Sequence, residues 1–456
     1  MLLVTALSFA PFLGGGMLTD DFVHLSEARK TGGLARSFTT PDPFGFYRPL
    51  PQLSFALESS TFGHAPVLSR TTNLVLHLAV LCAAFLLARL LLGTDLAAFL
   101  ATLAFALTPK AHPIAVLWIS ARSELLMALF SMLAVSAWIA WDRGGRPWLL
   151  GAAAICYLLA FLSKETAVLL PMLLLITPTG HPMFAARRLV AAGAIAAIGV
   201  AVFAWRTWVG ALVPISLDPH YNLATPMFRW SRNARNYLWR ALPSPAALLA
   251  VAGLTMWKCA GGVLRRGVAG QRSSEPAEPR PLALALYAAA WFVVFIAPVL
   301  PIVARSELYL YLPGFGFCLF AGCLVQRTID NAVRFRPAVV AVAVYVAALG
   351  GYQISRSAAL HEDLSFSATF VSALADSKWI ATNPGPWLLV PDDAVTERFL
   401  RDAIGGYLDV VLKRSLGLPI IGGAIAYPGE PRPAHSGLIA CVYRDGQVRL
   451  RHAGAE

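Results

Sequence analysis

The chain has 456 residues, of which 57% are hydrophobic and only 14% are charged, and its mean hydropathy is +0.63. Soluble domains carry about 25% charged residues, so this composition excludes an ordinary soluble protein and indicates an all-α polytopic membrane protein. The formal net charge of +12 does not indicate nucleic-acid binding, because the arginines lie in short turns between apolar blocks, which is the pattern of membrane orientation.

The apolar blocks predict about eleven membrane-spanning helices. The first block, Met1–Leu18, carries no charged side chain. It lacks the basic start and the A-x-A site of a signal peptide, so we interpret it as an uncleaved span. Two blocks, 95–110 and 165–178, are short enough to be tilted or joined to interfacial helices. The predicted spans lie near residues 1–18, 67–92, 95–110, 121–141, 148–163, 165–178, 188–210, 237–258, 281–304, 307–326 and 337–354.

Lys and Arg concentrate in alternate turns between these spans, near residues 89, 143–146, 187–188, 258–280 and 327–336. The positive-inside rule places those turns and the N-terminus in the cytoplasm. An odd number of spans then places the C-terminal tail outside, in the same compartment as loop 19–66. Basic residues also remain on the outer side next to the membrane, where they could bind a lipid-linked phosphate or ordinary lipid headgroups.

Two regions outside the spans have a composition of their own. Loop 19–66 is rich in Phe, Pro and Gly, which predicts interfacial helix and irregular coil. Residues 375–456 contain short apolar runs separated by turn signals. The expected elements of this tail are strands at Trp387–Pro391, Gly437–Tyr443 and Gln447–Arg451, with a helix around 394–415. The predicted organisation is a membrane domain over 1–355 and a small extracytoplasmic α+β domain over 375–456.

Five polar clusters lie on the predicted outer side, each beside an apolar block. The first contains the acidic pair Asp20-Asp21, which is either a solvated helix end or a general base at the membrane surface. The pairs Lys164-Glu165 and Arg122-Glu124 either neutralise themselves or belong to a site. In chain order, the clusters are Thr19–Asp21, Phe46–Leu50, His112–Glu124, Ser163–Glu165 and Arg305–Pro313.

The order of these clusters resembles that of the integral-membrane glycosyltransferases of the GT-C fold, which take sugar from a polyprenyl-phosphate carrier. The chain looks closest to the protein O-mannosyltransferases, especially the membrane half of those that carry tetratricopeptide repeats. It lacks the repeats, and its loop 211–236 is too short for the β-trefoil domain of other members, so their acceptor specificity is not carried over. The motifs that carry the resemblance are TDD at 19–21, YRPL at 47–50, RTTNLVLH at 70–77, HPIAVLWISARSELL at 112–126, LLAFLSKE at 158–165 and RSELYLYLPGFGF at 305–317.

The resemblance implies a direct displacement of the carrier by the acceptor. The carrier phosphate leaves as an anion, so it needs positive charge rather than an acid, and we assign Arg48, Lys164 and Arg305 to it. The acceptor hydroxyl needs a general base, which the resemblance assigns to Asp20, with Asp21 as the second candidate. No metal or other cofactor is expected, because the carrier has one phosphate. The candidate substrate-pocket residues are Tyr47, His112, Arg122, Glu124, Glu165, Glu307, Tyr309 and Tyr311.

The sequence thus predicts an enzyme that moves a mannose-like hexose or another sugar from a polyprenyl-phosphate carrier to an acceptor hydroxyl on the outer face of the membrane. Its expected partners are that lipid-linked sugar, a protein, glycan or lipid acceptor, and the bilayer. Tyr309 and Tyr311 do not share a helical face, so we expect one of them to belong to the core or an interface.

Other classes of membrane protein stay open. A secondary transporter should show internal repeats and broken helices at mid-membrane, and we see no clear repeat. An O-antigen-type ligase or polymerase should concentrate its chemistry in a late, long outer loop, whereas the acidic pair comes first here. A non-catalytic scaffold would be favoured by loss of the acidic pair, which is present.

Overall fold

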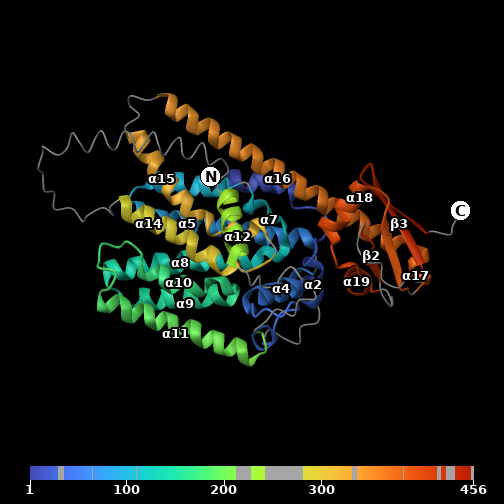
Figure 1. Ribbon diagram of the computed structural model, residues 1–456, viewed down its shortest axis with the longest axis horizontal. Coiled ribbons are helices and arrows are strands. Elements are labelled where there is room, and N and C mark those ends of the chain that lie inside the picture. Colours follow the sequence, from blue (N-terminus) through green and yellow to red (C-terminus); the bar gives the residue numbers. More distant parts are fainter. Residues whose placement is uncertain are drawn as a thin grey trace, which may run out of the picture.

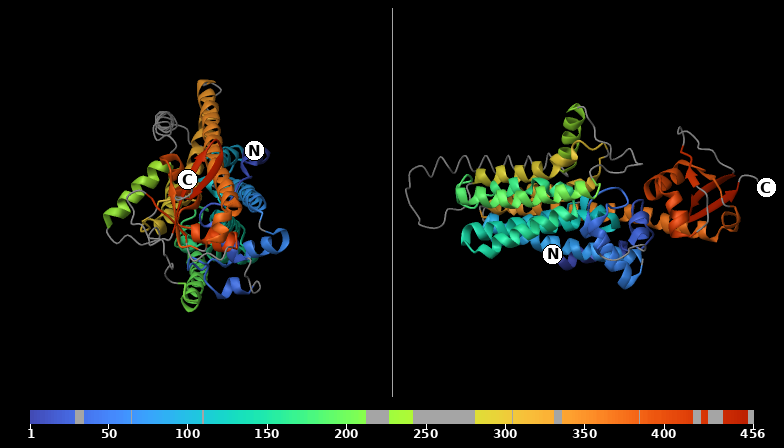
Figure 2. Two further views of the ribbon diagram at one scale, coloured as in Figure 1. Left: turned by 90° about the vertical axis from the view of Figure 1, so that its right-hand side faces the viewer. Right: turned by 90° about the horizontal axis from the view of Figure 1, so that it is seen from below.

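The chain folds as a bundle of long helices with a small sheet domain at one end, as the computed structural model shows (Figure 1). The sheet domain extends the long axis of the bundle in the right-hand view of Figure 2, and the left-hand view looks along that axis with the sheet domain facing the viewer. We call the end of the bundle beside this domain the site end, and the opposite end, with the turn at Gly144–Pro147, the far end. The structure describes residues 1–28, 35–63, 65–108, 110–211, 227–241, 281–303, 305–330, 336–383, 385–417, 423–427 and 437–452.

The bundle helices begin and end at local sequence signals. Helices α5 (Pro66–Leu92) and α9 (Pro147–Ser163) each have proline in the first turn, where its missing N–H removes no helical hydrogen bond. Gly93 follows α5 at φ +80°, and Gly145 follows α8 (Arg122–Gly144) at φ +69°, and glycine adopts this conformation without strain. The other bundle elements are α6 (Asp95–Ala106), α7 (Ala111–Leu117), η2 (Ile119–Ala121), η3 (Glu165–Leu169), α10 (Leu170–Leu175), α11 (Ala186–Trp208), α14 (Pro281–Ile296), η5 (Ala297–Val299), η6 (Glu307–Leu310) and α15 (Gly314–Asp330).

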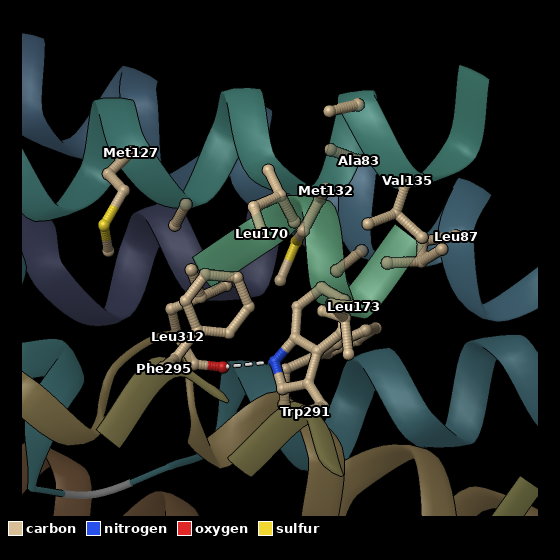
Figure 3. Close-up of a cluster of buried hydrophobic side chains, with 14 of the residues drawn as sticks. Ala83, Leu87, Met127, Met132, Val135, Leu170, Leu173, Trp291, Phe295 and Leu312 are labelled. Atoms are coloured by element: carbon tan, nitrogen blue, oxygen red, sulfur yellow. Dashed lines mark hydrogen bonds between the residues drawn. The ribbon is translucent and has the colours of Figure 1, made fainter. Parts of the chain in front are cut away.

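The bundle core is apolar and tightly packed (Figure 3). Side chains from α5, α8 and α10, among them Leu87, Val135 and Leu173, converge on Trp291 of α14. The Trp291 indole N–H donates to the carbonyl of Leu312 at 2.8 Å, so its one polar group is satisfied although the ring is fully buried.

Four described helices are long and apolar enough to cross a membrane, and their bounds are Pro66–Leu92, Ile119–Gly144, Ala186–Trp208 and Leu282–Val299. The pair α6 and α7 is a fifth candidate, bent by 71° between its two parts. The predicted span 95–110 therefore ends earlier, at Ala106, and part of the expected loop 111–120 is helical. The count of eleven stays a prediction. Most of the predicted span 237–258, together with the polar linker 265–280, lies outside the described residues.

The first predicted span is wrong in its length. Only α1 (Leu2–Phe9) and η1 (Ala10–Phe12) are helical, which corresponds to about 16 Å at 1.5 Å per residue. A bilayer core is about 30 Å thick. Residues Leu13–Asp20 continue as irregular chain that leads directly into α2.

Loop 19–66 is largely helical, with α2 (Asp21–Ala28), α3 (Arg36–Thr39) and α4 (Pro49–Phe62) at the site end. Helix α12 (Met227–Ala241) lies across the long helices in Figure 1 and projects from the side of the bundle in the right-hand view of Figure 2. Its Asn233 amide donates to the carbonyls of Leu300 and Ile302 at 2.9 and 3.0 Å. The arginine-rich helix α12 includes the first five residues of the predicted span 237–258, and the rest of that span lies outside the described residues.

Helix α16 (Arg336–Asp376) has 41 residues, or about 60 Å of helix, and connects the bundle to the sheet domain (Figure 1). The predicted span 337–354 forms the first part of this helix, which continues without a break to Asp376. The remaining elements of the sheet domain are α17 (Lys378–Thr382), β1 (Trp387–Pro391), α18 (Ala394–Phe399), η8 (Leu400–Ile404), α19 (Leu408–Val410), η9 (Val411–Ser415), β2 (Gly423–Ile425), β3 (Gly437–Arg444) and β4 (Gln447–His452).

The sheet has the strand order β2-β1-β3-β4, in which β1 is parallel to both neighbours and β3 pairs antiparallel with β4. The three predicted strands are confirmed, and β2 is an additional one. The predicted helix over 394–415 is interrupted after Ile404, where Gly405 adopts φ +59°. A buried cluster joins this domain to the bundle, because Phe9, Phe22 and Leu117 pack in one core with side chains of α16, β1 and η8.

Candidate functional site

The irregular segment before the acidic pair is held by one buried arginine. Arg70 of α5 donates from Nη1 to the carbonyls of Leu13, Gly14 and Gly15 at 3.1 to 3.2 Å, and from Nη2 to the carbonyl of Gly16. A guanidinium carries five N–H donors in a fixed fork, so it can satisfy successive carbonyls that no helix or strand would bind. The role of Arg70 was not predicted, although the run Gly14-Gly15-Gly16 was a signal for close backbone packing.

Helix α16 covers the other side of this segment. The Gly16 N–H donates to the carbonyl of Leu364 at 2.7 Å. A Cβ atom at Gly15 would lie 2.7 Å from the Leu364 side chain, and one at Gly16 would lie 2.6 Å from the backbone N of Ala368. Glycine is therefore required at both positions for the backbones to approach this closely.

The two neighbouring carboxylates have different environments. Asp21 is fully buried and accepts from Leu18 N–H at 3.1 Å, Ser120 N–H at 2.8 Å and Ser120 Oγ–H at 2.6 Å. Burial raises the pKa of Asp21, and the hydrogen bonds and the charge of Arg70 act in the opposite direction. Asp20 is only partly buried, and its Oδ1 accepts from the hydroxyl of Tyr407 at 2.6 Å. The Asp21 carboxylate is thus hydrogen-bonded in the interior, whereas the Asp20 carboxylate lies nearer the surface.

Two of the three predicted phosphate ligands are ion-paired. Arg48 donates to both oxygens of Glu165, at 3.0 and 2.6 Å, and its guanidinium lies 3.9 Å from the ring centre of Phe46. Lys164 pairs with the buried Glu124. Lys164 and Glu165 therefore do not pair with each other, although they are adjacent in sequence. Each of the two cations instead binds a carboxylate of another element. Both remain candidates for phosphate binding only if these pairs open or share their charge.

Arg305, the third predicted phosphate ligand, is exposed between η5 and η6. Within the described part of the chain it has no hydrogen-bond or ion-pair partner. Glu307, two residues later, is bound by Arg356 at 3.2 Å and lies 3.9 Å from Arg240. Arg305 is thus a cation at the site end, and the nearby Glu307 carboxylate pairs with other arginines instead of with Arg305.

The remaining predicted pocket residues divide between surface and core. The Tyr309 ring lies 4.8 Å from the Lys164 ammonium. Tyr311 is fully buried, and its hydroxyl lies 2.7 Å from His77 Nδ1 and its ring 4.7 Å from that of His112. One tyrosine of the pair thus belongs to the core, as the spacing indicated. Tyr47 is buried and donates to a carbonyl of α3 at 3.0 Å.

Arg122, also predicted as a pocket residue, is fully enclosed. Its side chain donates to Glu58 at 2.7 Å, to Asn73 Oδ1 at 3.0 Å and to the carbonyl of Ser69 at 3.0 Å. The guanidinium also lies 4.4 Å from the ring centre of Phe55. These bonds join α4, α5 and α8 at the site end, so the geometry supports a structural role for Arg122.

Two titratable residues of the site end were missed. The Asp42 carboxylate accepts from the N–H groups of Phe44 and Phe46 at 2.9 and 2.8 Å, and burial raises its pKa from 3.8 to about 6. His24 is packed between Phe44 and Phe55. Burial lowers the pKa of His24 to about 3, so it stays neutral at physiological pH. A single sequence gives little signal for either shifted pKa, because both shifts depend on how deeply the side chain is buried in the folded protein.

Comparison with known proteins identifies the fold. No protein-family model matches the chain, and no curated protein matches it in sequence. Among solved structures, ArnT from Cupriavidus metallidurans bound to undecaprenyl phosphate is similar over 100% of this chain and 97% of its own, with a TM-score of 0.51 and 13% identity. The chain has the GT-C fold. The oligosaccharyltransferase AglB from Archaeoglobus fulgidus, in complex with an inhibitory peptide and a dolichol-phosphate, gives a TM-score of 0.42 and 12% identity over 94% of this chain and 61% of its own.

The GT-C fold and the apolar helices make this chain an integral, multi-pass membrane protein. In this fold the acidic pair, the three cations and the sheet domain all lie at the site end of the bundle. Among the described residues, no group of three His, Cys, Asp or Glu side chains could hold a metal ion. That no metal takes part in the reaction stays a prediction.

Proposed function

We propose that this chain is a glycosyltransferase that moves a sugar from a polyprenyl-phosphate carrier to an acceptor hydroxyl at the membrane surface, with Asp20 as the general base. The observation that carries the proposal is the difference between the two adjacent carboxylates. Asp21 accepts three hydrogen bonds from the protein and is fully buried. Asp20 lies at the surface of the same helix end, where it could accept a proton from a bound hydroxyl.

Positive charge at the site end supports the donor part of the proposal. A phosphate that leaves as an anion is stabilised by preorganised cations. Arg305 is exposed and unpaired within the described chain, so it could bind such a phosphate without first releasing a carboxylate. Its planar fork suits two phosphate oxygens at once. Lys164, beside Tyr309, and Arg48 are each paired with a carboxylate, so Arg305 supplies the charge that needs no such exchange.

The proposed reaction balances without a cofactor. The acceptor oxygen forms a bond to the anomeric carbon of the sugar, and the bond from that carbon to the carrier phosphate breaks with its electron pair going to the phosphate. Asp20 takes the hydroxyl proton. The single displacement inverts the anomeric centre and requires no second carboxylate as nucleophile.

The test is transfer of labelled sugar from a polyprenyl phosphate to acceptors in native membrane extracts, with purified protein in proteoliposomes. Asp20→Asn should reduce the rate by about 10²–10⁴ because Asn cannot accept the proton. Asp95→Asn is the matched control, since Asp95 is exposed at the far end and pairs with Arg89. Full activity of Asp20→Asn would refute its role as base. Mass analysis of envelope glycans with and without the gene would identify the sugar and the acceptor.

We also propose that the site end faces away from the cytoplasm, because the described basic turns, at Arg89, Arg143–Arg146 and Arg187–Arg188, lie at the far end. The exposed positions Arg146, at the far end, and Gln447, in the sheet domain, offer a direct test. In intact cells an impermeant maleimide should label Gln447→Cys but not Arg146→Cys, and permeabilisation should expose both. The wild-type protein controls for its own cysteines. Equal labelling from outside would contradict this orientation.

A further inference from the structure

The sheet domain contacts the acidic pair itself. Tyr407 lies between η8 and α19, and its hydroxyl donates to Asp20 Oδ1 at 2.6 Å across 387 positions of sequence. The Tyr407 ring is also edge-on to Phe44, at 6.3 Å between ring centres. The proposed base is therefore bound by a side chain from a different domain, and an O–H bond to a carboxylate is among the stronger hydrogen bonds in proteins.

The backbone beside Asp20 is bound to η8, the helical element that precedes Tyr407. The Thr19 N–H donates to the carbonyl of Ala403 at 2.9 Å. Thr19 has φ +38°, which is strained for a β-branched residue and persists only where its surroundings hold it. Gly405 is close by, and a Cβ atom there would lie 3.6 Å from the Thr19 methyl group. Two hydrogen bonds with the segment Ala403–Tyr407 thus hold both Thr19 and Asp20.

We propose that the sheet domain is part of the active site, and that Tyr407 is the positioning residue that orients the Asp20 carboxylate. This inference rests on the proposed function. The Asp20 carboxylate takes the acceptor proton when the new glycosidic bond forms and the phosphate leaves, and the hydrogen bond from Tyr407 to Oδ1 fixes the orientation of that carboxylate. Tyr407 keeps its own proton throughout, so it acts through Asp20 rather than on the substrate.

The Tyr407→Phe variant isolates the hydroxyl. Phenylalanine keeps the ring and its edge contact with Phe44 but cannot donate to Asp20. Misplacing a reacting group by about 1 Å can cost on the order of 100-fold in rate. We therefore expect kcat to fall roughly 10- to 100-fold, with the KM for the lipid-linked donor unchanged and an activity loss that persists well below the thermal midpoint. Tyr443→Phe is the matched control, because Tyr443 lies in the same domain and its ring packs on Phe366 and Phe399.

A double-mutant cycle separates positioning from a structural role. If Tyr407 acts through Asp20, then Tyr407→Phe should have no further effect on the rate once Asp20 is Asn. An unchanged kcat in Tyr407→Phe overturns the proposal. A lowered thermal midpoint whose activity loss disappears on cooling also overturns it, since the hydroxyl would then only hold the domain in place.

A second readout does not depend on activity. With 3-fluorotyrosine at position 407, the ¹⁹F resonance should shift when Asp20 is replaced by Asn, and Asp95→Asn should leave it unchanged. Absence of that shift overturns the contact, whatever the assay shows. If the wild type transfers no sugar although the resonance shifts, the proposed function fails while the contact stands, so the two failures are distinguishable.

Discussion

Asp21 should support the fold and not the chemistry, and Asp21→Asn tests this directly. An amide has one oxygen where the carboxylate has two. If the Asn oxygen keeps the two donors of Ser120, its NH₂ group faces the Leu18 N–H, which then has no acceptor. The lost bond to a charged group is worth roughly 1.5–3 kcal/mol, and a buried unpaired donor costs about 1–3 kcal/mol more.

One effect offsets part of this loss. Burial raises the pKa of Asp21, so the wild-type protein already bears a desolvation cost that the neutral amide avoids. We expect a net loss of about 2–4 kcal/mol in the free energy of unfolding. Ser120→Ala removes only the Oγ–H donor and should cost about 1 kcal/mol. Both substitutions should lower the free energy of unfolding, and Asp21→Asn should lower it more than Ser120→Ala.

The assay is the thermal unfolding midpoint of the purified protein in detergent, beside the transfer rate measured well below that midpoint. Asp21→Asn should melt several degrees lower than wild type and keep much of its activity when cold. Asp20→Asn should melt like wild type and lose its activity. An Asp21→Asn protein with a normal midpoint and no activity would refute this division of roles and assign the proton transfer to Asp21.

Other predictions concern the cations and the pH dependence of stability. Arg122→Met should cost about 3–5 kcal/mol because it leaves the buried Glu58 carboxylate without its cation. Adding Glu58→Met should restore part of the lost midpoint, and additive effects would contradict the pairing. Because the pKa of Asp42 is raised to about 6, its ionisation destabilises the folded state as pH rises between roughly 4 and 6. Asp42→Asn should therefore be more stable than wild type by a margin that grows with pH, up to about 3 kcal/mol at neutral pH. The free energies of unfolding of both proteins near pH 4.5 and pH 7 measure that margin, and an equal margin at the two pH values would refute the prediction. Arg305→Ala should weaken the apparent affinity for the lipid-phosphate donor by at most about 1.5–3 kcal/mol. The loss should exceed that of Arg305→Lys, since Lys keeps the charge without the planar fork. Donor titrations with Arg146→Ala as the control decide this, and an unchanged affinity and rate in Arg305→Ala would exclude Arg305 from the phosphate site.

The sequence by itself determined the elements that depend on local patterns. Uninterrupted apolar blocks predicted the long helices, and the strands at Trp387, Gly437 and Gln447 followed from short apolar runs between turns. Local hydropathy failed where conformation depends on distant contacts. Leu13–Asp20 is apolar up to Leu18 but not helical, because the Arg70 guanidinium and α16 bind its backbone. Helix α16 continues past the apolar block because its later turns pack on the sheet domain.

Only the tertiary structure decided which charged groups meet. Lys164 and Glu165 are adjacent in sequence, yet Lys164 pairs with Glu124 and Glu165 with Arg48, since side-chain partners depend on distance in space. The different environments of Asp20 and Asp21 have the same cause. Successive residues at a helix start point in different directions, so one carboxylate meets Ser120 in the interior and the other meets Tyr407. No pattern within the motif reports that second contact, because its partner lies 387 positions away.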